Sequence, residues 1–436
     1  MIDRSVDDDA GRPPNIVVIY ADDLGWGDLG CFGADDLATP HIDGLCASGV
    51  RLSQWYANAP VCSPSRAALL TGRHPAHAGV ESILGGSRHT SGLPHQDTLA
   101  SRLRDRGYAT AILGKWHLGA AHEYRPSKFG FDTAFGFRAG CVDYYSHIFY
   151  WGGHDPVHDL WEDDDEVWAN GEYLTTVIGE RAAGFIADNA HRPFFAYVAF
   201  NAPHYPLHAP AEYVERFAHL PEDRRMIAAM ISAMDDAVGV ILASLDEHGL
   251  RGDTVVFLSS DNGPSDETRN WLNGEEVSYL GGSAGGLRGH KGSLFEGGIR
   301  VPSIISWPGH LPAGVDHASP AAMIDVLPTV LEAVDGAVPD DDTLDGVSQL
   351  GALRVAGTAT DRAPRSLFWG SAGQWAIRRG QLKLLENPTE GMGPPAVYES
   401  ALFDLDADPG EARDLASERP DVVAELAAAL DEFKHR

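Results

Sequence analysis

Residues 15–20 of the chain read Asn-Ile-Val-Val-Ile-Tyr, and two aspartates follow them after a single alanine. A short run of β-branched residues bounded by polar ones is typical of a buried strand. Comparable runs recur at 108–113, 193–200 and 254–260, and longer helical patterns separate them. This alternation predicts an α/β fold, with a large, mixed, mostly parallel sheet sandwiched by helices.

Polar residues follow each of these four strands. They are Asp22 and Asp23, then Lys115 and His117, then His204, and finally Asp261 and Asn262. The carboxyl ends of parallel strands meet at one edge of an open sheet, where ligands bind, so we expect these segments to converge on one crevice. Asp22, Asp23, Asp261 and Asn262 offer only hard oxygen donors. Such donors suit Ca²⁺, with Mg²⁺ as the alternative, rather than Zn²⁺.

The composition is that of a globular protein that can build a large core, with 436 residues of which 44% are hydrophobic. The 33 basic and 63 acidic residues give a formal charge of −30, which opposes binding to nucleic acid or to anionic membranes. We find neither a stretch as long as a membrane span nor a secretory signal. We therefore expect a cytoplasmic protein, or a periplasmic or secreted one if a signal has been removed.

The cysteines are too few and too widely spaced for a disulfide framework. We expect Cys31, Cys46 and Cys141 to be buried thiols. Apolar residues at helical spacing across 221–250 predict a long helix whose methionines fill the core.

A change of composition at 335–345, where Pro339 stands among acidic residues, indicates a solvated connection. We predict a catalytic α/β domain at 1–340 and a smaller C-terminal α+β domain at 341–436. In that second domain the patterns predict strands at 375–385 and 397–405, and a closing amphipathic helix at 420–434.

The string Cys62-Ser63-Pro64-Ser65-Arg66, continued by Ala-Ala-Leu-Leu-Thr-Gly-Arg, begins a helical pattern. Taken alone, it reads equally well as a helix start, because Ser and Pro suit the first turn. Three further strings accompany it along the chain: Gly-Lys-Trp-His-Leu-Gly at 114–119, Asn-Ala-Pro-His-Tyr-Pro at 201–206 and Leu-Arg-Gly-His-Lys-Gly at 287–292. Together these strings carry more weight than any of them alone.

With these motifs the chain resembles the type I, formylglycine-dependent sulfatases of the alkaline-phosphatase-like superfamily, across 15–302 and again at 402–409. The resemblance implies that a formylglycine-generating maturase oxidises Cys62 to an aldehyde, whose hydrate attacks sulfur. It also implies that Asp22, Asp23, Asp261 and Asn262 hold the cation together with the modified Cys62.

The resemblance further implies roles for the basic residues. Arg66 would orient the hydrated aldehyde, and Lys115 would bridge it to the sulfate. Either His204 or Lys291 would protonate the departing oxygen, and His117 would take a proton as sulfate is released. Lys115, His204 and Lys291 would also bind the substrate. Glu296 and Arg300 would form a structural pair.

The stretches 131–137 and 143–147 are locally similar to N-acetylgalactosamine-4-sulfatase, also called arylsulfatase B. A sulfate ester of a carbohydrate, small or oligomeric, is therefore the leading substrate class. The similarity implies sugar contacts by His147, and by Asp143 and Tyr144 beside it. The loop 151–168, rich in aromatic and acidic residues, would line the mouth of the site.

Other activities stay open at the level of sequence. A small aryl or alkyl sulfate or a sulfamate needs the same attack on sulfur. A phosphodiesterase of the same superfamily and an inactive, sugar-binding relative are the rival classes. Cys62 at the nucleophile position and Asn262 at the metal position argue against a phosphodiesterase. The retention of all the candidate catalytic and metal-binding residues argues against an inactive relative. The oligomeric state cannot be read from the sequence.

Overall fold

The computed structural model describes residues 12–150, 156–266, 270–272, 275–277, 280–357, 365–392 and 399–435. Within these residues the largest sheet has ten strands, and five neighbouring strands at its centre run parallel. Their order across the sheet is β15 (Val315–His317), β2 (Val50–Leu52), β14 (Ser303–Ser306), β11 (Thr254–Ser260), β1 (Asn15–Ala21), β10 (Phe194–Ala199), β4 (Ala109–Lys115), β5 (Thr133–Phe137), β8 (Trp161–Glu162) and β9 (Asp165–Glu166).

Antiparallel strands flank this parallel centre, because β14 pairs with β11 and β8 pairs with β5 in the opposite direction. The predicted mixed, mostly parallel sheet is therefore confirmed. Short two-stranded pairs lie outside it: β3 (Trp55–Tyr56) with β16 (Ala321–Ala322), β6 (Ile148–Phe149) with β7 (Val157–His158), and β12 (Asn270–Leu272) with β13 (Glu275–Val277).

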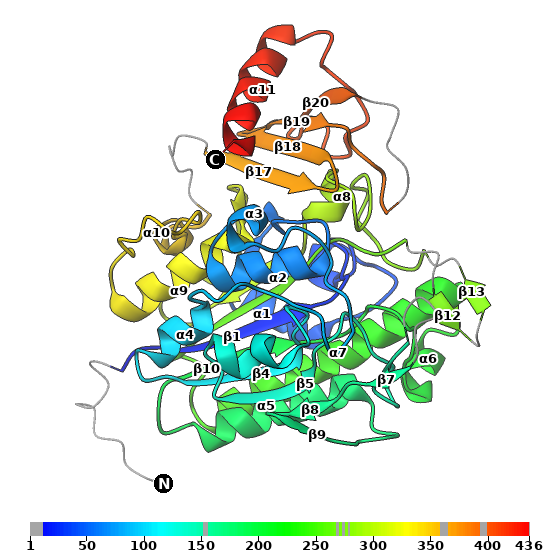
Figure 1. Cartoon of the computed structure of the whole chain (residues 1–436), viewed down its shortest axis with the longest axis vertical. Coiled ribbons are helices and arrows are strands. Elements are labelled where there is room, and N and C mark those ends of the chain that lie inside the picture. The colour runs from blue at the N-terminus through cyan, green and yellow to red at the C-terminus, as the bar shows by residue number, and fades with distance from the viewer. Residues whose placement is uncertain are drawn as a thin grey trace.

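Helices cover both faces of the large sheet, because the central strands are apolar on both sides (Figure 1). In β1, residues Ile16, Val18 and Tyr20 face one layer, and the alternate residues face the other. The first layer contains α2 (Cys62–Thr71), α3 (Pro75–Ala78), α4 (Leu99–Arg104), α9 (Val326–Asp335) and α10 (Leu350–Arg354). The second contains α1 (Pro40–Ala47), α5 (Leu174–Asp188), α6 (Ala211–Arg216) and α7 (Glu222–Glu247).

Helix α7 is the long helix predicted at 221–250, and Met230 and Met234 are buried in the core as expected. By length and composition alone this helix could cross a membrane, contrary to the expectation from the sequence. However, 78% of its most apolar window is buried inside the molecule, which is typical of the core helix of a globular domain.

The C-terminal part forms a separate antiparallel sheet with one helix over it (Figure 1). Its elements are β17 (Ser366–Ser371), β18 (Gln374–Arg379), β19 (Leu382–Glu386), β20 (Ser400–Asp404) and α11 (Pro420–Lys434). The helix predicted at 420–434 is confirmed, whereas the single run expected at 375–385 is the hairpin of β18 and β19. Residues 397 and 398 of the last predicted strand lie outside the described residues.

The domain boundary after residue 340 stays a prediction. Helix α10 packs into the core of the large domain through Leu350 and Leu353. The first strand of the small sheet begins only at Ser366, so we propose a boundary between α10 and that residue.

A buried ion cluster joins the two domains where α8 (Glu296–Ile299) meets β19. The Lys383 ammonium lies 2.9 Å from Glu296 Oε1 and 3.0 Å from Glu411 Oε1, and all three side chains are fully buried. The Tyr56 hydroxyl donates to Glu296 Oε2 at 2.6 Å. Arg300 lies 3.6 Å from Glu296, so the structural pair expected from the sequence is present.

The expectation of three buried thiols is correct for Cys141 but wrong for Cys31 and Cys46, which are partly exposed. The physical reason is their position. Cys31 lies in the short 3-10 turn Gly30–Phe32 and Cys46 in α1, both at the outer edge of the second helix layer. Further 3-10 turns in the described part of the chain are His122–Tyr124, Pro126–Phe129 and Met323–Asp325.

Candidate active site

The four predicted strand ends lie side by side at one edge of the large sheet. Tyr20 of β1 pairs with Ala199 of β10, which in turn pairs with Gly114 of β4. On the other side of β1, Ala21 pairs with Ser260 of β11. The polar residues that follow these strands therefore begin side by side, and the predicted convergence of the four segments is present.

Helix α2 brings Cys62 and Arg66 to this edge. Cys62 is the first residue of the helix and Arg66 lies one turn further on, and both are buried. The Cys62 Sγ atom is 3.6 Å from Asp22 Oδ1. Arg66 donates through Nε and Nη2 to Asp261 Oδ2, at 3.0 and 2.7 Å. The first turn of α2 is thus both a helix start and one wall of the site.

Three carboxylates and three cationic side chains meet here with 3% exposure or less: Asp22, Asp23 and Asp261 with Arg66, Lys115 and Lys291. The Lys115 ammonium donates to Asp22 Oδ2 at 2.7 Å, and the Lys291 ammonium to Asp23 Oδ2 at 2.9 Å. Charges removed from water are tolerated only when they are paired in this way.

Two acids of the cluster have pKa values that are shifted in opposite directions. Burial raises the pKa of Asp22 to about 8, against the lowering effect of Lys115. Burial also raises the pKa of Asp261, but the charges of Arg66 and Lys115 outweigh it and bring it to about 2. Burial raises the pKa of the Cys62 thiol well above its ordinary value, so the thiolate is disfavoured.

Two histidines complete the site, and their partners fix their tautomers. His204 Nδ1 donates to the carbonyl of Tyr205 at 2.7 Å, so Nε2 accepts from the Lys291 ammonium at 3.1 Å. His117 Nε2 donates to the carbonyl of Leu84 at 2.9 Å, which leaves the lone pair of Nδ1 available. Burial, followed by the charge of a nearby lysine, lowers the pKa of both rings well below its ordinary value.

The donor set at this edge fits a hard cation. One ligand atom each from Asp22, Asp23, Cys62 and His204 lies within 4.8 Å of the others. Asn262 donates its amide N–H to Asp23 Oδ1 at 2.6 Å, and its own Oδ1 is buried with no partner in the described part of the chain. An orphaned amide oxygen beside carboxylates is a ready ligand for Ca²⁺. Asp261 is not part of that group of four, but its Oδ1 accepts from the backbone N–H of Asp23 at 3.2 Å, so its role as a ligand stays a prediction.

The sugar contacts expected of His147, Tyr144 and Asp143 stay predictions. His147 is fully buried, and no hydrogen bond or ion pair between described residues joins it to the charged cluster. The Tyr144 hydroxyl donates to the carbonyls of Asn201 and His204, at 2.6 and 2.8 Å, so it holds the loop that carries His204. Asp143 accepts from the backbone of Tyr145 at 2.8 Å and fixes a turn.

Part of the predicted mouth loop, residues 151–155, lies outside the described residues. At its other end Trp168 is 65% exposed and stacks on His158, with ring centroids 3.7 Å apart.

Sequence reasoning missed the support beneath Arg66. The Tyr20 ring lies 5.3 Å from the guanidinium carbon of Arg66, and the Tyr20 hydroxyl is 3.2 Å from Ser65 Oγ. Its position as the last aromatic residue before Asp22 was the one available signal.

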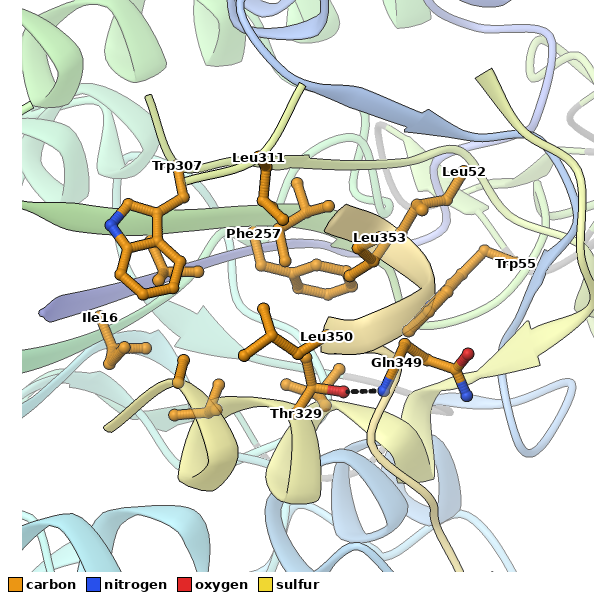
Figure 2. A pocket seen from close by; sticks show the side chains of 15 residues that line it. Ile16, Leu52, Trp55, Phe257, Trp307, Leu311, Thr329, Gln349, Leu350 and Leu353 are labelled. Atoms are coloured by element: carbon orange, nitrogen blue, oxygen red, sulfur yellow. Dashed lines mark hydrogen bonds between the residues drawn. The ribbon is translucent and has the colours of Figure 1, made fainter. Parts of the chain in front are cut away.

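A separate cavity lies at the opposite end of the same strands and has a different character (Figure 2). Ile16 and Phe257 contribute from the large sheet, and Leu350 and Leu353 from α10. Its lining is almost entirely apolar, and the side-chain hydroxyl of Thr329 accepts from the backbone N–H of Gln349 at 2.9 Å. A sulfate ester would find no charge there, so the strand-end cluster is the candidate active site.

Comparison with known proteins defines the class. The sulfatase family model matches residues 14–337. Arylsulfatase A of Bos taurus is 34% identical over 98% of this chain and 88% of that protein, and N-acetylgalactosamine-6-sulfatase of Sus scrofa is 34% identical over 81% and 68%. The crystal structure of Ps i-CgsB superposes with a TM-score of 0.83, at 30% identity over 97% of this chain and 93% of that one.

The chain therefore belongs to the sulfatase family and is a hydrolase of sulfate esters. The family resemblance and the fold expected from the sequence are both confirmed.

Proposed function

We propose that the protein hydrolyses the sulfate ester of a carbohydrate, with formylglycine made from Cys62 as the nucleophile and Ca²⁺ as the bound cation. One observation carries the proposal: Cys62 begins a buried helix with Arg66 one turn away, and Asp22 and Lys115 lie against it. The raised pKa of the thiol supports a precursor role, because an unmodified Cys62 would be a poor nucleophile.

The modified residue would supply a hydrate with two hydroxyl groups, one to attack sulfur and one to expel sulfate while the aldehyde re-forms. A cation held by Asp22, Asp23, Asp261 and Asn262 would act as a Lewis acid on a sulfate oxygen. Around these groups the chain's own residues bind charge and move protons.

Arg66 and Lys115 place positive charge beside residue 62, where the sulfate oxygens would lie. Preorganised cations in a site closed to water stabilise the negative charge of a transferring group more effectively than they would in water. Both cations are anchored by carboxylates, Arg66 by Asp261 and Lys115 by Asp22, so they need no rearrangement when substrate binds.

The pair of Lys291 and His204 provides the proton for the departing alcohol. Their nitrogens are 3.1 Å apart, and only Lys291 carries a proton in that contact because His204 is neutral with its own proton directed at Tyr205. On the other side, His117 Nδ1 is the free base that accepts a proton as sulfate leaves.

The relatives support a carbohydrate substrate. N-acetylgalactosamine-6-sulfatase is among the curated relatives at 34% identity, and Ps i-CgsB has been crystallised with a neocarrahexaose. Arylsulfatase A and steryl-sulfatase match at the same identity, so small aryl and steryl sulfates belong in the same test, with sulfamates as a further group.

The test begins with the tryptic peptide 52–66, which contains Cys62. Protein produced with a maturase should show the aldehyde by mass spectrometry and release sulfate from at least one sulfated sugar. The matched control is protein produced without the maturase, which should carry the thiol and be inactive. Aldehyde-bearing protein that cleaves aryl sulfates but no sulfated sugar would contradict the carbohydrate assignment.

The cation is tested on the same sample. After chelation, Ca²⁺ should restore turnover and raise the melting temperature, and Mg²⁺ should do so less well, because the site offers several hard oxygens without demanding octahedral geometry. Equal activity of chelated and Ca²⁺-loaded protein would remove the metal from the proposal.

A further inference from the structure

A second cavity, more polar than the first, lies between the two domains and is lined by residues of α3 and of the turn from β17 to β18. It measures about 130 Å³, enough for several water molecules or for one sugar ring in their place. Asn58, His74 and Glu81 line it from the large domain, and Phe368 and Trp375 from the small one.

The floor of this interdomain cavity carries polar groups that lack partners. Asn58 is 2% exposed, and its Oδ1 accepts from the backbone N–H of Ile324 at 2.9 Å. Its amide Nδ2 donates to none of the described residues. His74 is 8% exposed, and its Nδ1 makes no hydrogen bond within the described chain. A buried ring nitrogen without a partner, such as His74 Nδ1, calls for a ligand or for ordered water, and the Asn58 amide can bond to the same occupant.

The walls are aromatic and the rim carries one acid. Phe368 stacks on Phe433 with ring centroids 4.5 Å apart, and the half-buried ring of Trp375 lies beside them. Glu81 stands exposed at the rim. A pyranose ring matches this combination, because its C–H face packs on aromatic rings and its hydroxyls bond to amides and carboxylates. The charge of Glu81 disfavours a ring that bears sulfate.

Two short segments connect the cavity to the catalytic cluster. Asn58 precedes Cys62 by four residues, a distance of at most about 14 Å even in an extended chain. Glu81 precedes Leu84 by three residues, and the Leu84 carbonyl accepts from His117. A sugar in the cavity would thus lie within the reach of a short oligosaccharide whose sulfate is at residue 62.

We propose that the interdomain cavity binds an unsulfated sugar ring of the oligosaccharide that carries the scissile sulfate. The site rests on the proposed carbohydrate function and deepens it: it selects oligosaccharides over monosaccharides, because only the longer chain fills both places. The small domain thereby contributes directly to substrate choice.

The experiment uses the full-length matured protein and a substitution at the rim. Ala76 is exposed and lines the cavity, so Ala76→Phe fills the space without disturbing the core, and Ala76→Ser is the matched control. The probes are carrageenan and chondroitin hexasaccharides, each with its sulfates and after desulfation. Binding is followed by calorimetry, and sulfate release is measured in parallel on the hexasaccharides, on a sulfated monosaccharide and on p-nitrophenyl sulfate.

We expect at least one desulfated hexasaccharide to bind, Ala76→Phe to weaken it by about tenfold or more, and Ala76→Ser to bind as the wild type does. The same Phe variant should lose turnover of the sulfated hexasaccharide relative to the monosaccharide. If no desulfated hexasaccharide binds, or if Ala76→Phe binds as tightly as the control, the proposal is wrong.

The two proposals fail separately in this design. Binding of a desulfated hexasaccharide that Ala76→Phe abolishes, without hydrolysis of any sulfated sugar, would keep the cavity and overturn the carbohydrate sulfatase. Hydrolysis of sulfated sugars with no effect of Ala76→Phe would do the reverse.

Discussion

Two buried ion clusters in this molecule are built from similar acidic and basic residues but have different roles. At the strand ends, Asp22, Asp23 and Asp261 face Arg66, Lys115 and Lys291. At the domain interface, Lys383 bridges Glu296 and Glu411. The members named in both clusters are almost completely removed from water.

The difference lies in what surrounds the charges. The strand-end cluster leaves Asn262 Oδ1 and His117 Nδ1 without partners among the described residues, so it is shaped for groups that the chain itself does not supply. In the interface cluster the chain itself supplies the partners: Lys383 and Tyr56 donate to Glu296. Glu411 Oε1, which has no hydrogen bond within the described residues, still lies 3.0 Å from the Lys383 ammonium. We infer that the first cluster trades stability for chemistry, whereas the second holds the domains together.

The largest expected effect separates function from folding at the strand ends. Cys62→Ala removes the nucleophile precursor, and we expect sulfate release to fall by a factor on the order of 10³ or more, as for the loss of other enzymatic nucleophiles. The change deletes one buried sulfur atom, so the melting temperature should fall by only a few degrees. If Cys62→Ala released sulfate at nearly the rate of the matured wild-type protein, the mechanism would be contradicted.

Lys383→Met, at the domain interface, should have the opposite result: a large loss of stability and little loss of activity. It leaves Glu296 and Glu411 buried without their shared cation, and breaking such a contact costs about 3–5 kcal/mol. Urea unfolding should show this loss in the free energy of unfolding, while turnover per folded molecule changes little. The exposed pair of Arg413 and Glu418 offers a control, since Arg413→Met should cost about 1 kcal/mol or less. A small loss for Lys383→Met would mean that the interface cluster does not stabilise the protein.

Asp261→Asn sharpens the comparison further, because it weakens the anchor of Arg66 and removes one expected cation ligand. Loss of such a supporting group typically costs about 10–100-fold in metal affinity or activity. We expect turnover and Ca²⁺ retention to fall together. The control is Asp335→Asn, which breaks a surface pair with Arg106 and should leave both unchanged. An unaltered rate in Asp261→Asn at limiting Ca²⁺ would remove this carboxylate from the site.

The convergence of the strand-end residues could be predicted from the sequence, because each of these residues is local to its strand. Asp22 follows β1 and Lys115 ends β4, so the short apolar runs and the rule for strand ends were sufficient to place them together. Cys62 and Arg66 were also local, since one helical turn separates them.

Partnerships across the chain could not be predicted in this way. Arg66 pairs with Asp261, 195 residues away, and Lys291 with His204, 87 residues away, and no pattern within either segment specifies the pair. The interdomain cavity is a stronger example, because Asn58 and Trp375 become neighbours only when the small sheet docks on the large domain. The sugar contact of His147 stays a prediction, and the burial of its ring follows from tertiary packing that its own segment does not specify.

The smallest expected effect is a pH dependence of the free energy of unfolding that arises from Glu411 in the interface cluster. Burial raises the pKa of Glu411 to about 7, from an ordinary value of 4.5. The folded protein therefore holds this proton where the unfolded chain has lost it. The stability that Glu411 contributes is fully present below pH 4.5 and is lost as the pH rises through 7. Glu411→Gln mimics the protonated acid at every pH, so it should remove this part of the decline.

Urea unfolding at pH 5, 6 and 7 measures the slope. The free energy of unfolding of Glu411→Gln should fall less steeply over this range than that of the wild type. Glu418→Gln, at a surface pair with Arg413, should leave the slope unchanged. Glu296, the other acid bound to Lys383, has the opposite pH dependence. Burial raises its pKa, but the charges of Lys383 and Arg378 outweigh burial and lower the pKa to about 2. The stability that Glu296 contributes is therefore present above pH 4.5 and is lost as the pH falls through 2. A slope identical in Glu411→Gln and wild type would show that Glu411 is ionised in the fold, and that Lys383 neutralises two charges rather than one.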